Sequence, residues 1–132
     1  MLDAEGLLAD FTPLQPYTPE AAASAPTSPG VHVVLDRGTV VYVGWTGNLR
    51  NRLRQHLTGN RESSVLHQQV GQCLDTPARA ATRQDVAGWL GRCEVRWQET
   101  DNPEAAKETL VLTLMPLFNR QIPKPRKAVE PE

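Results

Sequence analysis

The alternation of apolar and polar residues predicts a β-hairpin early in the chain. Two valine-rich runs, "VHVVLD" (31–36) and "TVVYVG" (39–44), flank the turn sequence "DRG". β-Branched and aromatic residues favour strands, and a short loop containing glycine is typical of a hairpin. A three-residue loop would place His32 directly opposite Tyr42 on one face, whereas a two-residue loop would shift the register and separate the two side chains.

Leucines repeated every four residues predict a helix at about 48–57 with one apolar stripe. Residues four apart lie on neighbouring turns of a helix, so Arg52 and His56 share one flank of this stripe. We expect both side chains to lie where the helix meets the sheet. Arginine suits phosphate contact there, and a histidine one turn away can donate a hydrogen bond or move a proton.

The remaining patterns predict, in chain order, a helix, a short helix or turn, a third strand and a final helix. They cover 63–74, 83–90, 93–99 and 102–115. Asn102 is the expected cap of the final helix, followed by Pro103 at its first position. The resulting order, β-β-α-α-(α)-β-α, predicts an α+β fold with helices packed against a small sheet.

The two ends differ in composition from the middle of the chain. Residues 1–27 are rich in proline and alanine, so we expect an extended N-terminal extension packed loosely on a domain at 28–120. The alternative is that the extension docks on the core through Phe11, Leu14 and Tyr17. Residues 121–132 are interrupted by prolines and are expected to form a flexible tail.

Charge is unevenly distributed although the 132-residue chain has a formal net charge of only −1. The segment 45–61 contains arginines and no acidic residue, and such a local basic patch can contact phosphates. Arg50, Arg54 and Arg61 are therefore candidates for nucleic-acid binding; the alternative for Arg50 and Arg54 is a solvated basic face.

Localisation is judged from what the sequence lacks. It has no apolar run near the roughly 20 residues of a membrane span, and its acidic N-terminus differs from a secretory signal. We therefore expect no membrane partner and a cytoplasmic location. The pattern predicts no particular oligomeric state.

Several short motifs together resemble one nuclease family. The first half contains Gly30-Val31-His32, Tyr42-Val43-Gly44, Asn48-Leu49-x-x-Arg52 and His56. The second half contains a helical Glu108, the apolar residues Val111 and Leu112 three and four positions later, and then Pro116-x-x-Asn119. In this order and spacing, the motifs resemble a GIY-YIG nuclease domain.

The resemblance implies a three-stranded antiparallel sheet flanked by helices and a metal-dependent DNA endonuclease. Tyr42 would activate or orient the nucleophile, Arg52 would clamp the phosphate, and His56 would hydrogen-bond a phosphate oxygen or Tyr42. Glu108 would bind one Mg²⁺ or Mn²⁺ ion through a hard carboxylate oxygen.

Two further positions would support that site. Gly44 belongs to the second glycine motif. Asn119 would brace the final turn against the metal site; alternatively, it only ends the helix and loop.

Three positions depart from the family pattern. His32 stands where the family has its first tyrosine, and an imidazole there can still relay a proton from Tyr42. Trp45 follows the second glycine and either stacks on a DNA base or is partly buried. Glu108 stands one residue nearer to Pro116 than the pattern places it; Glu104 is the competing carboxylate but lacks the apolar pair after it.

Two functions from different classes follow. The first is a DNA endonuclease of repair, mobile elements or defence, whose target specificity comes from DNA shape, from residues 63–92 or from a partner protein. The second is a catalytically weak module that binds nucleic acid or protein, which the change to His32 and the near-neutral charge favour.

Overall fold

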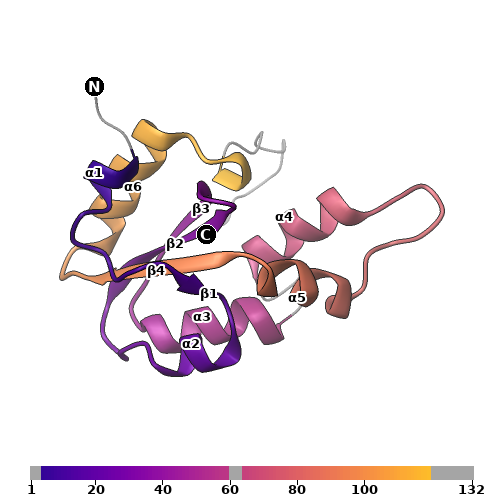
Figure 1. The fold of residues 1–132 in the computed structure, drawn as a ribbon, viewed down its shortest axis with the longest axis horizontal. Helices are drawn as coiled ribbons and strands as arrows, with labels where there is room; N and C mark the ends of the chain where they lie inside the picture. The colour runs from indigo at the N-terminus through magenta and orange to yellow at the C-terminus, as the bar shows by residue number, and fades with distance from the viewer. Residues whose placement is uncertain (1–3, 60–63, 120–132) are drawn as a thin grey trace, which may run out of the picture.

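The computed structural model describes residues 4–59 and 64–119, with an antiparallel sheet at its centre (Figure 1). Strand order is β1-β4-β2-β3. The strands are β1 (Gln15–Pro16), β2 (Gly30–Asp36), β3 (Thr39–Thr46) and β4 (Glu94–Glu99). The α+β class is confirmed, but the sheet has four strands, because the N-terminal segment adds the short β1 to the edge of β4.

The helices lie close to the predicted positions. They are α1 (Ala4–Leu7), α2 (Pro19–Ala23), α3 (Leu49–Thr58), α4 (Val65–Leu74), α5 (Arg83–Gly91) and α6 (Pro103–Leu114), with a final 3₁₀ turn η1 (Leu117–Asn119). Side-chain caps at Asn48, Ser64 and Asn102 fix where α3, α4 and α6 begin. No helix in the described ranges is long and apolar enough to cross a membrane.

The two faces of the sheet are covered by different helices (Figure 1). One apolar cluster lies on one face of the sheet. It joins Leu8 and Phe11 to buried valines of β2 and β3 and to Leu110 of α6. The other cluster joins the opposite face to α2, α3, α4 and α5. A polar side chain on this second face therefore lies beneath α3, where Arg52 and His56 were expected.

The N-terminal segment is part of the folded core, so the expectation of loose packing is wrong. Tyr17 is fully buried and its hydroxyl donates to the Leu53 carbonyl over 2.7 Å. Phe11 is also buried, whereas Leu14 is 50% exposed. The docking alternative is correct for two of its three residues. Tyr17 thereby ties this segment to α3.

The hairpin turns through two residues, Arg37 and Gly38, which both have positive φ angles of 54° and 86°. Such a turn follows the right-handed twist of the flanking strands. Asp36 pairs with Thr39 across it. The expected three-residue loop is therefore wrong.

A β-bulge one residue pair beyond the turn shifts which side chains share a face of the two strands. Leu35 pairs with Val40 but Val34 pairs with Tyr42, so Val41 is the extra residue. His32 consequently lies opposite Gly44, not opposite Tyr42 as the three-residue loop predicted. The bulge nevertheless keeps His32 and Tyr42 on the same face, as diagonal neighbours.

Candidate active site

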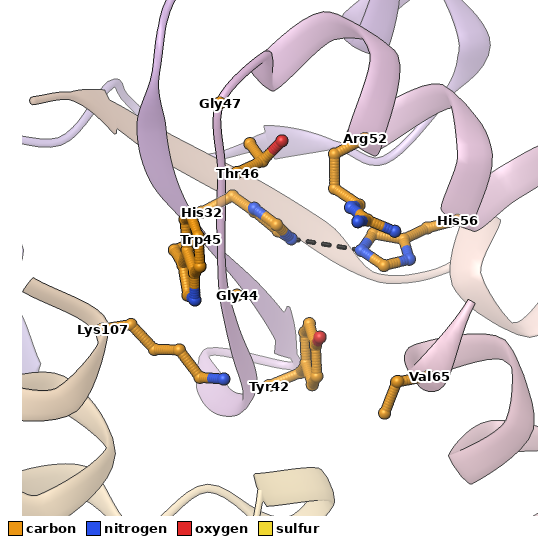
Figure 2. Close-up of a pocket in the computed structure, with 10 residues that line it drawn as sticks. All are labelled: His32, Tyr42, Gly44, Trp45, Thr46, Gly47, Arg52, His56, Val65 and Lys107. Atoms are coloured by element: carbon orange, nitrogen blue, oxygen red, sulfur yellow. Dashed lines mark hydrogen bonds between the residues drawn. The ribbon is translucent and has the colours of Figure 1, made fainter. Parts of the chain in front are cut away.

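A pocket of about 310 Å³ opens beside the edge strand β3 (Figure 2). Its walls come from β2, β3, α3, α4 and α6. It is lined by His32, Tyr42, Gly44, Trp45, Thr46, Gly47, Arg52, His56, Val65 and Lys107. The structure thus brings together the hairpin residues and the pair on α3 that the sequence indicated.

Two buried histidines face one another at the base of the pocket. The Nε2 atoms of His32 and His56 are 3.2 Å apart, so one ring donates a hydrogen bond to the other. His56 Nδ1 lies 2.6 Å from the Ser64 hydroxyl, which also accepts a hydrogen bond from the His67 N–H. Ser64, the N-cap of α4, therefore ends a short series of hydrogen-bonded side chains that begins at His32.

Both histidines are held neutral near pH 7. Burial, followed by the charges of Arg52 and Lys107, lowers the pKa of His32 to about 3. The pKa of His56 falls well below its usual range, first through burial and then through His32 and Arg52. A neutral pair joined by one hydrogen bond adds no charge of its own to the pocket.

Tyr42 packs against both histidines. Its ring centroid is 6.0 Å from that of His32 and 5.7 Å from that of His56, the latter edge to face. A Cβ atom on Gly44 would lie 2.7 Å from His32 Cε1 and 3.0 Å from Tyr42 Cε2. The glycine is therefore required for the three rings to meet.

Two cationic side chains enter the pocket from opposite sides, Arg52 from α3 and Lys107 from α6 (Figure 2). Both positive charges also help to lower the pKa of His32. Among the residues that the structure describes, none that lines the pocket is aspartate or glutamate. An arginine and a lysine with neutral histidines form a site suited to an anion such as a phosphate group.

The orientation of α6 differs from the expected one by one residue. Leu110 is 4% exposed and Val111 packs in the same cluster, whereas Leu112 is 72% exposed. Leu110 and Val111 are therefore the apolar pair that packs on the sheet. They follow Lys107 by three and four positions, and in the family pattern the residue at that distance before the pair is a glutamate. Lys107 occupies that position, and the placement expected for Glu108 beside the phosphate site is wrong.

Glu108 and Glu104 line a second cavity of about 390 Å³, here called the outer groove. Trp45 and Lys107 line both cavities and separate them. Glu108 is exposed, because one step along a helix turns a side chain by about 100°.

The residues of the pocket do not fit a divalent cation such as Mg²⁺. Such ions prefer carboxylate oxygens, and this pocket offers an ammonium group where the family pattern has its carboxylate. Across residues 4–59 and 64–119, no three His, Cys, Asp or Glu side chains are grouped so as to hold a metal.

Asn119 supports the wall of the pocket from outside it. Its Oδ1 accepts from the Val43 N–H over 2.7 Å, and its Nδ2 donates to the Val43 carbonyl over 3.0 Å. Val43 lies between Tyr42 and Gly44 on an edge strand, whose backbone groups are open to other partners. The amide thus fixes β3 at the two residues that face the histidines.

The other residues predicted to bind nucleic acid are not gathered in the pocket, apart from Trp45, which is 41% exposed at its rim. Arg50 Nε donates to the Ala25 carbonyl over 2.8 Å and so ties α3 to the N-terminal segment. Arg54 is exposed on α3. Arg61 and the tail at 121–132 lie outside the described residues.

Sequence reasoning missed Lys107, which lines the pocket, and Ser64, which contacts His56. The Leu110–Val111 pair was a usable signal for Lys107, since it follows that residue at the spacing of the pattern. For Ser64, the signal was a serine just before an apolar run, which marks a helix N-cap. Its contact with His56 depends on how α3 and α4 pack.

Comparisons with known proteins agree on one family. The sequence model of the GIY-YIG catalytic domain matches residues 31–129. UvrABC system protein C of Treponema denticola is 48% identical over 44 residues, which are 33% of this chain and 7% of that protein. The Streptococcus gordonii protein of the same name is 46% identical over 41 residues, 30% of this chain and again 7% of that protein.

This chain is also similar to a solved structure. The GIY-YIG N-terminal endonuclease domain of UvrC from Thermotoga maritima, bound to its catalytic magnesium ion, has a TM-score of 0.49 and 21% identity. The match covers 76% of this chain and 92% of that one. The chain spans only a small part of the curated relatives. Its match to the family model covers most of its length, and the chain belongs to the GIY-YIG catalytic domain family.

Proposed function

We propose that this chain binds the sugar–phosphate backbone of DNA in the pocket and cleaves a phosphodiester bond there. One observation carries the proposal: a single pocket gathers Tyr42, the neutral His32–His56 pair and two cations. Membership of a family of catalytic domains supports cleavage rather than binding alone.

The cations bind the substrate. Arg52 and Lys107 approach from opposite walls and contact the non-bridging oxygens of one phosphate, with arginine able to make two parallel hydrogen bonds. Negative charge grows on these oxygens as the phosphorus becomes five-coordinate, so the same contacts stabilise the transition state.

Tyr42 moves the proton, and the neutral histidines pack against its ring. A water oxygen attacks phosphorus, a new P–O bond forms, and the P–O bond to the departing sugar breaks. The Tyr42 hydroxyl takes a proton from the water as it gives its own to a non-bridging phosphate oxygen, and the departing sugar oxygen takes a proton from solvent. The products are a phosphate monoester end and a free hydroxyl.

No step of this proposal passes through a metal ion. The single Mg²⁺ or Mn²⁺ ion expected from the sequence required the Glu108 carboxylate in the pocket, and that carboxylate lies in the outer groove. Target specificity is assigned to DNA shape or to a partner protein, because the pocket contacts backbone phosphate and not base edges.

A second function is favoured by the absence of a carboxylate among the described residues that line the pocket. A GIY-YIG domain with a cationic pocket can bind nucleic acid without cutting it. Binding and cleavage must therefore be measured separately, on the same DNA.

The test compares the wild type with Tyr42→Phe on supercoiled plasmid and on flapped, branched and plain duplexes. We expect nicking that falls by about 10²–10⁴-fold in Tyr42→Phe, the range typical of a lost proton-transfer group, while DNA affinity is retained. Arg92→Ala, which removes an exposed charge outside the pocket, serves as the control. Equal trace nicking in wild type and Tyr42→Phe would refute cleavage, and retained binding would then support the second function.

A further inference from the structure

We propose that the Lys107 ammonium group supplies the positive charge that a divalent cation would otherwise provide, so that the pocket engages a phosphodiester without metal. The proposal rests on the pocket being the DNA site proposed above. It makes a separate claim, which is that metal plays no part in holding the phosphate.

The fold, not a chance side-chain rotamer, directs Lys107 into the pocket. Asn102 caps α6 and Pro103 is buried at its first turn. Leu110 and Val111 pack on the face of the sheet opposite to α3 and fix the rotation of the helix. With this rotation, Lys107 points towards β3 and ends between Trp45 and Tyr42 (Figure 2).

The electrostatics of the pocket favour an anion and disfavour a cation. Arg52 and Lys107 line the pocket together with His32, and both charges help to depress the pKa of that histidine. The histidines stay neutral, and no lining residue within 4–59 and 64–119 is acidic. A divalent ion placed there would meet two positive charges with no carboxylate, whereas a phosphodiester would meet both as partners.

The two nearby carboxylates are kept on the other side of this lysine. Glu104 and Glu108 line the outer groove, and Lys107 together with Trp45 forms the boundary between groove and pocket. A metal bound by Glu104 or Glu108 would therefore lie outside the pocket that holds Tyr42 and the histidines.

The first experiment measures the affinity of the full chain for a fluorescent DNA duplex in EDTA, over a range of salt concentrations. We expect the wild type to bind equally well with EDTA or with Mn²⁺. Lys107→Ala should bind less tightly, and the slope of log affinity against log salt should fall by about one, as expected for one lost phosphate contact. Lys107→Arg keeps the charge and should keep the slope, which separates charge from folding.

Two controls complete this experiment. Arg92→Ala removes one exposed charge away from the pocket and should leave the slope unchanged. Lys107→Glu places a carboxylate in the pocket, and we expect it to lose binding in EDTA and to recover part of it with Mn²⁺. Mn²⁺ binding by this variant can be followed by electron paramagnetic resonance, without any assay of activity.

The outcomes separate this inference from the proposed cleavage. Binding in EDTA that depends on Lys107 supports the inference even if no DNA is cut. Wild-type binding or nicking that requires Mg²⁺ or Mn²⁺ overturns it while leaving cleavage intact. An unchanged affinity and salt slope in Lys107→Ala would also overturn it.

Discussion

Two cavities share the wall formed by Trp45 and Lys107, yet they present opposite charges. The described residues of the pocket include Arg52, Lys107 and neutral histidines but no carboxylate, whereas those of the outer groove include Glu104 and Glu108. A single step along α6 separates Lys107 from Glu108. The chemistry offered to a phosphate therefore depends on the rotation of one helix, which the packing of Leu110 on the sheet decides.

The largest difference in nicking rate is expected between two variants that each remove one charged group, one on either side of this wall. Arg52→Ala should lower the nicking rate by about 10²–10³-fold, as for the loss of one donor to a transition-state oxygen. Glu108→Ala should leave the rate within about twofold, because an exposed charge is well screened by water and salt. Single-turnover nicking of plasmid at saturating protein measures both. A large loss in Glu108→Ala would show that the groove, and not the pocket alone, serves the reaction.

The difference between α3 and α6 also explains what could be predicted from the sequence. On α3, three leucines spaced by four leave one inward face, so Arg52 and His56 fell where they were expected. On α6, Leu110, Val111 and Leu112 are consecutive, and the sequence pattern alone allows two rotations. Only contact with β2 and β3 selects the one that buries Leu110.

Two features of the fold depend on contacts distant in the sequence. The bulge at Val41 follows from the two-residue turn and from the need to keep apolar residues inward on both strands. The N-terminal segment has the composition of a linker, yet Tyr17 packs in the apolar core, where its hydroxyl donates to the Leu53 carbonyl. Composition describes how a segment behaves alone and not the surface that it meets.

The free energy of unfolding should decrease in acid, because the pocket, unlike the outer groove, contains buried histidines. In the unfolded chain a histidine takes up a proton near pH 6.5, but in the fold the pKa of His32 is about 3 and that of His56 is also well below normal. The unfolded state thus binds more protons below pH 6.5, and stability falls as pH decreases. The expected loss is about 1.4 kcal/mol per pH unit for each histidine that stays neutral.

Urea unfolding at several pH values between 7.5 and 5 measures this loss. His32→Phe removes one titrating group and should reduce the slope of unfolding free energy against pH. Parallel slopes for the wild type and His32→Phe would contradict the buried neutral pair.

A smaller effect is expected from filling the space between the rings. Gly44→Ala should destabilise the fold by about 1–3 kcal/mol, because its Cβ would overlap His32 and Tyr42. Gly47 lines the same pocket, but a Cβ there would meet nothing within 4 Å, so Gly47→Ala is the matched control. Thermal unfolding of both variants tests this, and equal melting temperatures would show that the rings yield at no cost.

The smallest effect is expected from Asn119, which holds strand β3 at Val43. Asn119→Ala removes two hydrogen bonds from the backbone of Val43, and we expect a loss of about 1–2 kcal/mol, since each such bond contributes roughly 0.5–1.5 kcal/mol net. The Val43 amide should then exchange its hydrogen faster, while amides of β2, which pairs on both sides, stay protected. Hydrogen exchange read by NMR distinguishes the two strands. Faster exchange in β2 as well would mean that Asn119 stabilises the sheet in general, and unchanged exchange at Val43 would mean that β3 is held without it.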